Sequence, residues 1–298
     1  MNGPMDFEIS EEDFPALYQS ADKNSLKSQT MFLRATRIRL ALLVAAALFG
    51  GFTWLWNGAD LAGVFAAVAF GGALITELYL LKARPERVWY DGRAVAESAK
   101  TLTWRYLVGG APFGTSGSTL QEVEELFLQR LRQIAHDLPG LHLVPIADST
   151  SQITTAMRSV RAWPLEQRRD LYRRGRIQDQ ANWYSSKAQW NIRRASVWAV
   201  AMAVVESLGL GGAVLKAANI MDVDLLGLAG AVVAAGVAWV QTKQHGTLAR
   251  AYAVAAQELG DISSRIDGPK TDEEWSPFVD QAEEAISREH TLWRASHS

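Results

Sequence analysis

The chain has 298 residues, of which 48% are hydrophobic and 21% are charged, and its formal net charge is −2. A charge so close to zero argues against bulk binding of nucleic acid, which needs a clear excess of Lys and Arg. The absence of cysteine excludes a disulfide framework, a thiol nucleophile and a cysteine-ligated zinc site. These averages alone would describe a soluble protein, but the charges are distributed very unevenly along the sequence.

The first 13 residues, MNGPMDFEISEED, are acidic and contain no apolar stretch. They do not match a secretory signal peptide, which needs an apolar core, and we expect this segment to be disordered. A polar helix is expected to follow from residue 14 and to lead into the first apolar segment.

Two pairs of apolar segments come next. Between residues 40 and 81 the only charged residues are Asp60 and Glu77, and residues 195–242 contain four. Each segment is close to the roughly 20 residues that a helix needs to cross the hydrocarbon of a bilayer. Two buried hairpins in a soluble helical protein are the alternative, because abundant Ala and Gly keep the hydropathy moderate. The predicted spans are residues 38–56, 61–81, 195–215 and 223–241.

The residues that flank these segments favour the membrane. Lys and Arg flank both hairpins at one end, and the opposite turns contain only Lys216. Since Lys and Arg stay on the cytoplasmic side, both termini and residues 82–194 are predicted to be cytoplasmic, in a multi-pass protein of the inner membrane. Trp and Tyr stand where the spans end, as in interfacial belts. The basic flanks are Arg34, Arg37, Lys82, Arg84, Arg87, Lys187, Arg193, Arg194, Lys243 and Arg250.

The predicted fold class is therefore an all-α integral membrane protein with two transmembrane helical hairpins, four transmembrane helices in all, and long cytoplasmic helical extensions. The first two-span domain is assigned to residues 14–138 and the second to residues 161–268. A linker (139–160) joins them, and an acidic helix (269–298) ends the chain.

Periodic apolar residues predict the cytoplasmic helices. Pro85 is expected to end or kink the second span, and a helix with one apolar stripe should follow it to residue 108. Ser118 and Gln121 offer a capping box for an amphipathic helix up to residue 138. The fourth span is expected to continue as a helix through residues 245–266.

Both hairpins are rich in small residues, such as Gly209 and Gly212. Small residues let helix backbones approach closely, and close packing drives helix association in lipid. We expect them to serve tight packing within the four-helix unit rather than a dedicated seam between copies.

Two carboxylates lie inside the predicted spans. Glu206 is near the middle of the third span, where an ionisable group costs a few kcal/mol unless it faces a partner or water. It either lines a pore or ion path, or is a protonated or internally hydrogen-bonded structural carboxyl. Glu77 is the second candidate for the ion path. It lies one turn from the cytoplasmic end of its span, where it can reach headgroup water or pair with Lys82.

Residues 161–194 form a basic stretch, with nine basic and three acidic residues. A juxtamembrane helix of this charge attracts the anionic headgroups of membrane lipids. An anionic signal molecule would be attracted equally, and nothing in the spacing selects one.

No catalytic or metal-binding motif stands out in the sequence. The five histidines show no ligand spacing, and the nucleophile-elbow and dinucleotide-binding patterns are missing. We therefore predict that the protein is not an enzyme and that it uses no metal, no cofactor and no nucleic-acid partner.

FPALY lies at residues 14–18, ERVWYDGRAVAESAKTLTWRYLVGGAPF at residues 86–113 and RIQDQANWYSSKAQWN at residues 176–191. The first two stretches resemble one subgroup of the SLATT family of predicted two-transmembrane effector domains from bacterial conflict systems, and residues 86–113 match the signature that follows its hairpin. The third stretch is similar to the signature that precedes the hairpin in another subgroup. The chain thus looks like two fused copies.

This resemblance implies a membrane effector of an anti-phage or conflict system. Such an effector would open a pore or disrupt the inner membrane when a separately encoded sensor or nucleotide-signalling protein is triggered. Because four helices alone cannot enclose a wide channel, we expect a homo-oligomer. The two signatures would form a cytoplasmic collar that couples the signal to the hairpins, with Arg93, Glu97, Lys100, Trp104, Arg105, Gln180, Trp183, Tyr184, Lys187 and Asn191 as its candidate residues.

Two other functions fit the same sequence. The chain could be a non-lytic ion channel or transporter subunit, in which Glu206 sets the ion flux. It could also be a membrane scaffold that recruits cytoplasmic partners, in which case Glu206 is dispensable and the collar is not.

Overall fold

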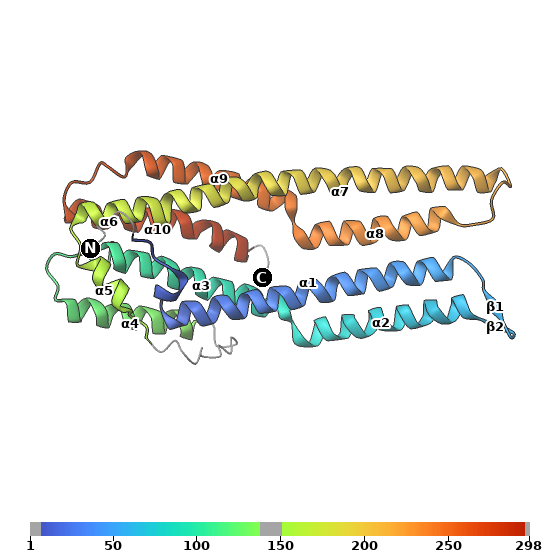
Figure 1. The fold of residues 1–298 in the computed structure, drawn as a ribbon, viewed down its shortest axis with the longest axis horizontal. Coiled ribbons are helices and arrows are strands. Elements are labelled where there is room, and N and C mark those ends of the chain that lie inside the picture. Colours follow the sequence, from blue (N-terminus) through green and yellow to red (C-terminus); the bar gives the residue numbers. More distant parts are fainter. Residues whose placement is uncertain (1–6, 138–150, 296–298) are drawn as a thin grey trace. The chain divides into compact units, whose positions relative to one another are not determined.

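The computed structural model describes residues 7–137 and 151–295, and in these ranges the chain is almost entirely helical (Figure 1). The predicted helical fold is therefore confirmed for the described part, which has one short strand pair, β1 (Leu55–Trp56) and β2 (Ala59–Asp60). A 3₁₀ turn (Glu11–Asp13) precedes α1, and a π-helical turn (Arg173–Gln178) joins α6 to α7. The helices are α1 (Ala16–Gly50), α2 (Leu61–Ala83), α3 (Pro85–Val108), α4 (Leu120–His136), α5 (Thr155–Arg161), α6 (Leu165–Tyr172), α7 (Asp179–Ala217), α8 (Leu225–Lys243), α9 (His245–Arg265) and α10 (Asp272–Ala295).

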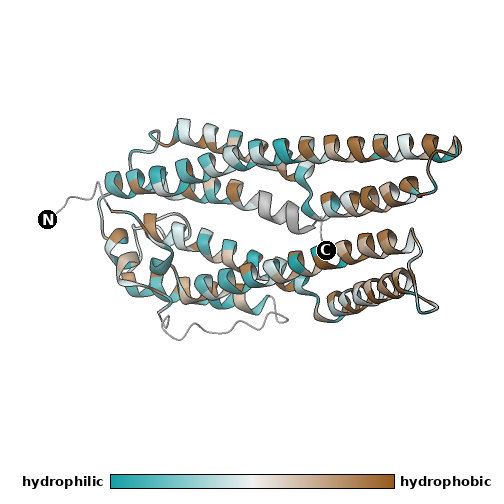
Figure 2. Cartoon of the chain, turned by 45° about the vertical axis from the view of Figure 1, so that its right-hand side comes forward, coloured by the Kyte–Doolittle hydropathy of each residue, from teal (hydrophilic) through white to brown (hydrophobic). Residues whose placement is uncertain are grey.

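These helices form two compact units. The polar unit comprises Met1–Ser28, Glu86–Lys187 and Ala251–Ser298, and the apolar unit comprises Gln29–Pro85 and Ala188–Arg250. Helices α1 and α7 each begin in the polar unit and end in the apolar unit. Hydropathy divides in the same way, since the hydrophobic residues concentrate on the helices of the apolar unit (Figure 2).

Three helical stretches of the described residues are long and apolar enough to cross a membrane: Leu61–Val108, Leu165–Ala217 and Leu225–Arg265. Each contains an 18-residue section with a mean hydropathy of at least 1.7, of which 11% at most is buried inside the chain. A soluble protein would bury such surface, because large exposed apolar patches associate in water. The alternative of two buried hairpins in a soluble protein is therefore rejected, and the chain is a membrane protein.

The first predicted span differs from its expected bounds of residues 38–56. Helix α1 ends at Gly50, and Asn57 and Gly58 form the turn between β1 and β2 with positive φ angles of 50° and 84°. An Asn-Gly pair favours this tight turn because both residues accept a left-handed backbone. The apolar part of α1 is thus shorter than expected, and its crossing of a membrane stays a prediction.

The second helix of each hairpin begins and ends with the same type of cap. Asp60 caps α2 and Asp224 caps α8, each by accepting a backbone N–H of the first turn. At the far ends, Arg84 and Gln244 have left-handed φ angles of 42° and 49°, which separate α2 from α3 and α8 from α9. The break before Pro85 agrees with the sequence. The break at Gln244 does not, because nothing in the sequence around it marks a helix end.

Residues 7–13 are ordered, against the prediction of a disordered start. They contain the 3₁₀ turn, and the Phe7 ring packs edge-on against Trp163 with ring centroids 5.1 Å apart. The contact of Phe7 with Trp163 therefore attaches this short acidic segment to the polar unit. Residues 1–6, and residues 139–150 of the predicted linker, lie outside the described residues, and α5 occupies most of the remaining linker.

Apolar periodicity places the core of the polar unit as predicted. The stripe of α3 that contains Val95 and Tyr106 is buried, as are Val123 and Phe127 of α4. The capping box of α4 lies one residue later than predicted.

This capping box pairs Thr119 with Glu122 rather than Ser118 with Gln121. The Glu122 carboxylate accepts the backbone N–H of Thr119 at 2.8 Å, and such a charge-assisted bond is stronger than the one that Gln121 would offer.

Glycines let α7 approach α8 closely within the apolar unit. A Cβ on Gly209 would lie 2.6 Å from the Cβ of Ala229, and one on Gly212 would lie 2.5 Å from the Cβ of Leu225. Packing inside one hairpin is thus confirmed for these two glycines. Their neighbour Gly211 has no atom within 4 Å of the same position.

Gly212→Ala should destabilise the hairpin, because the new methyl group must push α8 away from α7. Gly211→Ala is the matched control, and it should be neutral or stabilising by up to about 1 kcal/mol, the usual helix-propensity gain. Melting temperatures of the detergent-solubilised variants test this. Equal effects of the two substitutions would show that the close approach does not exist.

Candidate functional site

The polar unit contains a fully buried ion pair between Arg176 and Glu283. Nε and Nη2 of Arg176 lie 2.9 and 2.7 Å from the two carboxylate oxygens of Glu283 on α10. Tyr172 donates its hydroxyl to the same carboxylate at 3.0 Å, and Thr101 accepts from Nη2 at 3.2 Å. Both charged side chains are 1% exposed or less. Burial alone would lower the pKa of Arg176, but the Glu283 carboxylate outweighs it and raises that pKa.

Arg176 lies in the π-helical turn between α6 and α7. A π turn is rare within helices, and it occurs frequently at functional sites. Trp104 of α3 is buried next to this turn, and its ring meets that of Tyr172 edge-on at 5.9 Å. The turn thus combines an unusual backbone with a buried charge, and it marks the centre of the candidate site.

Four further predicted collar residues lie along α3 in the same unit. Arg93 pairs with Asp22 of α1 at 3.5 Å and with Glu97 one turn further along α3. Burial and the neighbouring Arg176 lower the pKa of Lys100. The fourth residue, Arg105, is described with the cavity below. The structure therefore brings Arg93, Glu97 and Lys100 into one charge network with Arg176, whereas Arg105 pairs separately with Asp280. The role of these residues as a collar stays a prediction.

The second predicted set is divided. Tyr184 is buried and Trp183 is half-exposed, and both rings contact Tyr252 of α9. Lys187 lies over the Trp183 ring, with Nζ 5.7 Å from its centroid. Gln180 is half-buried on α7. These four residues belong to the polar unit.

The fifth residue of that set, Asn191, belongs to the apolar unit. Its Oδ1 lies 2.7 Å from Nδ1 of His245, the first residue of α9, and both side chains are buried. Asn191 therefore joins two helices of the apolar unit and does not belong to the charge network.

The basic stretch 161–194 is mostly occupied by contacts inside the fold. Arg161 donates to the backbone carbonyls of Tyr106 and Phe113, each at 2.8 Å, and is buried. Arg168 donates to the Val108 carbonyl at 2.7 Å. The next four arginines of the stretch also have partners, which are Pro269 for Arg169, Asp267 for Arg173, Asp170 for Arg174 and Glu283 for Arg176.

The charges of six of the nine basic residues are thus buried or paired inside the fold, which makes them less attractive to lipid headgroups than unpaired cations. Within this stretch, contact with anionic lipid headgroups is therefore expected mainly of Lys187, Arg193 and Arg194. The partners that occupy the six arginines lie mainly in residues 267–283, roughly 100 positions away in the chain, where local charge counting does not find them.

The two carboxylates of the predicted spans have different environments. Glu77 pairs with Arg39 of α1 rather than with Lys82. Glu206 is exposed on α7, and its side chain forms no ion pair or hydrogen bond with the described residues. Glu206 is therefore the carboxylate of the apolar helices that still needs a partner.

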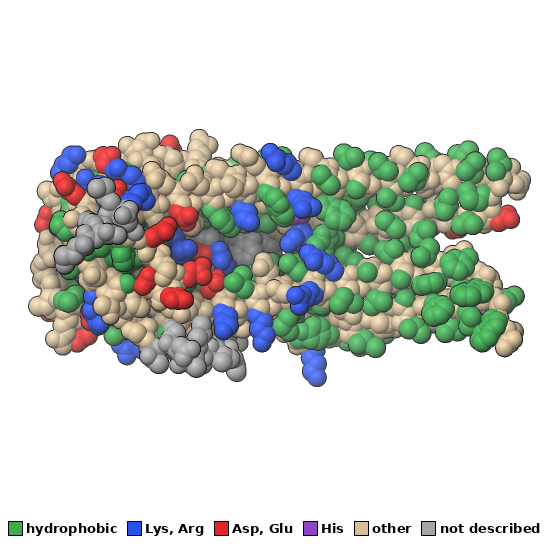
Figure 3. All heavy atoms as spheres, viewed as in Figure 1, with side chains coloured by type: hydrophobic (Ala, Val, Ile, Leu, Met, Phe, Trp, Pro, Cys, Tyr) green, Lys and Arg blue, Asp and Glu red, His purple; other side chains and the backbone are tan. Residues whose placement is uncertain are grey.

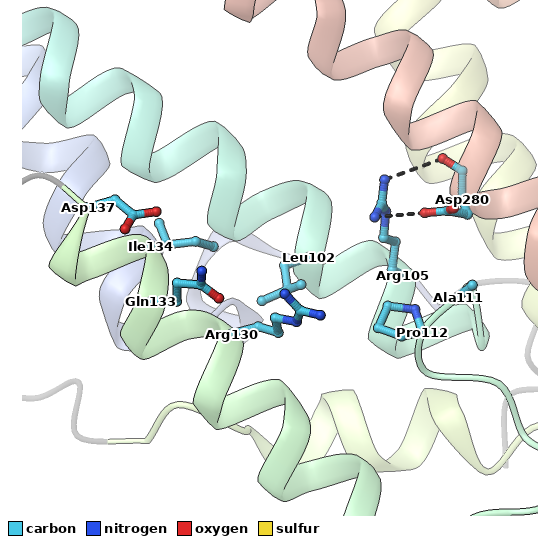
Figure 4. A pocket seen from close by; sticks show the side chains of 9 residues that line it. All are labelled: Leu102, Arg105, Ala111, Pro112, Arg130, Gln133, Ile134, Asp137 and Asp280. Carbon is cyan, nitrogen blue, oxygen red and sulfur yellow. Dashed lines mark hydrogen bonds and ion pairs between the residues drawn. The ribbon is translucent and has the colours of Figure 1, made fainter.

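A cavity of about 450 Å³ opens in the polar unit beside the charge network (Figure 4). Arg105 of α3 points to Asp280 of α10, with Nη1 2.7 Å from the carboxylate and Nη2 3.3 Å from the Asp280 carbonyl. Its Nε is buried and has no hydrogen-bond partner in the described part of the chain. The lining residues are Leu102, Arg105, Ala111, Pro112, Arg130, Gln133, Ile134, Asp137 and Asp280.

Glu283→Gln should destabilise the polar unit by about 3–5 kcal/mol, because it leaves the buried Arg176 without its counter-charge. The adjacent exposed Glu284→Gln is the matched control and should change stability little. Thermal unfolding and proteolysis of α10 measure the difference. If both variants melt together with the unchanged chain, the pair does not hold α10.

Comparison with known families matches both halves of the chain. Residues 15–169 match the SMODS and SLOG-associating 2TM effector domain 3, and residues 172–293 match the SMODS and SLOG-associating 2TM effector domain 1. No curated protein and no solved structure matches the chain. The resemblance inferred from residues 86–113 and 176–191 is therefore confirmed, including its two different subgroups. The protein belongs to the SLATT family and consists of two such two-transmembrane effector domains in tandem.

Proposed function

We propose that this chain is the membrane-acting effector of an anti-phage or conflict system, and that it acts by forming a pore rather than by catalysing a reaction. The observation that carries this proposal is the uncovered apolar surface of the hairpins together with the exposed Glu206 on α7. Such a surface needs lipid around it, and such a carboxylate needs a polar partner or water.

In this proposal both hairpins cross the inner membrane and the termini stay in the cytoplasm. Basic residues lie at one end of the apolar helices, as the orientation rule requires. On the face drawn in Figure 3, Lys and Arg side chains gather at one end of the hydrophobic helices of the apolar unit. The Arg39–Glu77 pair neutralises two charges that would otherwise enter the interface singly on α1 and α2.

Several copies would then assemble with Glu206 facing inward. Four helices have too small a perimeter to enclose a wide aqueous channel, whereas a ring of copies encloses one. A few kcal/mol of solvation cost for Glu206 would be removed in each copy by the water of the pore. The solvation cost of Glu206 thus favours assembly into a homo-oligomer.

A trigger from a separately encoded sensor or nucleotide-signalling protein would act on the polar unit. Helix α1 contains Asp22, which pairs with Arg93, and α7 begins directly after the π turn; both helices lead into predicted spans. A rearrangement around Arg176 can therefore bias the hairpins through continuous helices.

Cysteine labelling tests the four spans without background, because the chain contains no cysteine. Thr53→Cys and Asp222→Cys, in the two outer turns, should react with a membrane-impermeant maleimide in intact spheroplasts. Ser118→Cys should react only after lysis. If Thr53→Cys is protected while Asp222→Cys reacts, the first hairpin does not cross the membrane.

Expression together with the triggered sensor tests the pore through membrane potential and viability. Under these conditions the unchanged chain should depolarise cells, and Glu206→Leu should abolish depolarisation because it removes the polar lining. Ser207→Leu, at the next exposed position of α7, is the control and should stay active. A change in ion flux without a growth defect in Glu206→Gln would indicate a non-lytic channel. If the unchanged chain does not depolarise cells and Glu206→Leu has no consequence, the scaffold function remains.

A further inference from the structure

Two cations converge on one aromatic ring in the apolar unit. The guanidinium carbon of Arg37, on α1, lies 4.8 Å from the centroid of the Trp239 ring on α8. Nζ of Lys243, one turn after Trp239, lies 5.8 Å from the same centroid. Arg37 is exposed, and the other two side chains are half-buried.

This arrangement lacks an anion. Two like charges near one ring repel each other, and a cation–π contact at such a site returns only about 0.5–1 kcal/mol each. No acidic side chain of the described residues forms an ion pair with Arg37 or Lys243. By contrast, the neighbouring Arg39 is neutralised by Glu77.

The surroundings of the three residues are apolar on one side. Ile38, next to Arg37, is 54% exposed, and Val237 on α8 is 39% exposed. A tryptophan at the end of an apolar helix is typical of the depth at which headgroups begin. A free inorganic anion would need only the two cations, whereas a lipid would also use the exposed apolar side chains beside them.

We propose that Arg37, Trp239 and Lys243 bind the phosphate of one anionic phospholipid in the cytoplasmic leaflet, with its acyl chains along Ile38 and Val237. This site rests on the proposed membrane insertion, and it lies outside the basic stretch 161–194. The phosphate bridges the two cations, and the indole lies at the glycerol level. Because Arg37 comes from the first repeat and Lys243 from the second, one lipid joins the two hairpins.

The test uses the full chain in a mild detergent, with lipid binding read by native mass spectrometry and by the melting temperature. Phosphatidylglycerol should bind the unchanged chain and raise its melting temperature, and phosphatidylcholine should not. In Arg37→Gln/Lys243→Gln the affinity should fall about tenfold or more, the factor that corresponds to about 1.4 kcal/mol.

Arg34→Gln/Lys82→Gln is the matched control, because it removes the same charge from exposed positions at the same helix end. Equal loss of affinity in this control would overturn the site in favour of general electrostatic attraction. Equal stabilisation by inorganic phosphate would overturn the lipid as its ligand. Arg37→Lys keeps the charge and should retain most of the phosphatidylglycerol binding. This variant distinguishes loss of the charge from misfolding of the double variant.

Failure of the lipid site and failure of the proposed function give different results. If Thr53→Cys and Asp222→Cys both react from outside and phosphatidylglycerol does not bind, the hairpins cross the membrane and the lipid site alone is wrong. If neither cysteine reacts in intact spheroplasts, the proposed insertion is wrong, whatever the detergent-solubilised chain binds.

Discussion

Hydrocarbon neither donates nor accepts a hydrogen bond, and the apolar unit is organised around this constraint. Its backbone groups are paired inside helices, and the helix ends are closed locally. The carboxylates of Asp60 and Asp224 accept N–H groups at the starts of α2 and α8. The left-handed residues Arg84 and Gln244 return their N–H groups to carbonyls at the other ends. Among the charged side chains of this unit, Glu206 and the two cations beside Trp239 are informative, because none of the three forms an ion pair with the described residues.

The polar unit meets the opposite problem, because it buries charges among apolar side chains. Arginines at positions 105, 168 and 176 meet carboxylates at positions 280, 272 and 283 of α10. A shift of α10 by one residue would rotate these carboxylates by about 100° and leave buried arginines unpaired. The ion pairs thus select one register of α10 more than they add stability. A helix held in this way can be released as a whole when one pair is lost.

The sequence predicts much of this fold because apolar periodicity and helix caps are local signals. The stripe of α3 and the terminal helix both follow from such signals. Other features depend on partners distant in the chain. The excess of basic residues predicted that residues 161–194 contact lipid headgroups, whereas six of those arginines have partners within the fold. Glu283 interrupts the buried stripe of Trp275, Val279 and Ile286, and that irregularity is the signal that could have revealed it. Arg176 begins the SLATT signature but was missed because a π turn has no sequence pattern of its own.

The fusion of two unequal repeats has a consequence for charge. Glu206 lies on the first helix of the second hairpin, while Glu77 lies on the second helix of the first hairpin and is neutralised by Arg39. In a ring of such chains, only every second hairpin would contribute an unpaired carboxylate. The lumen would then carry half the charge density of a ring built from identical hairpins, with alternating anionic and neutral sectors. In the proposed ring, tandem duplication would thereby set the strength of cation preference separately from the diameter of the ring.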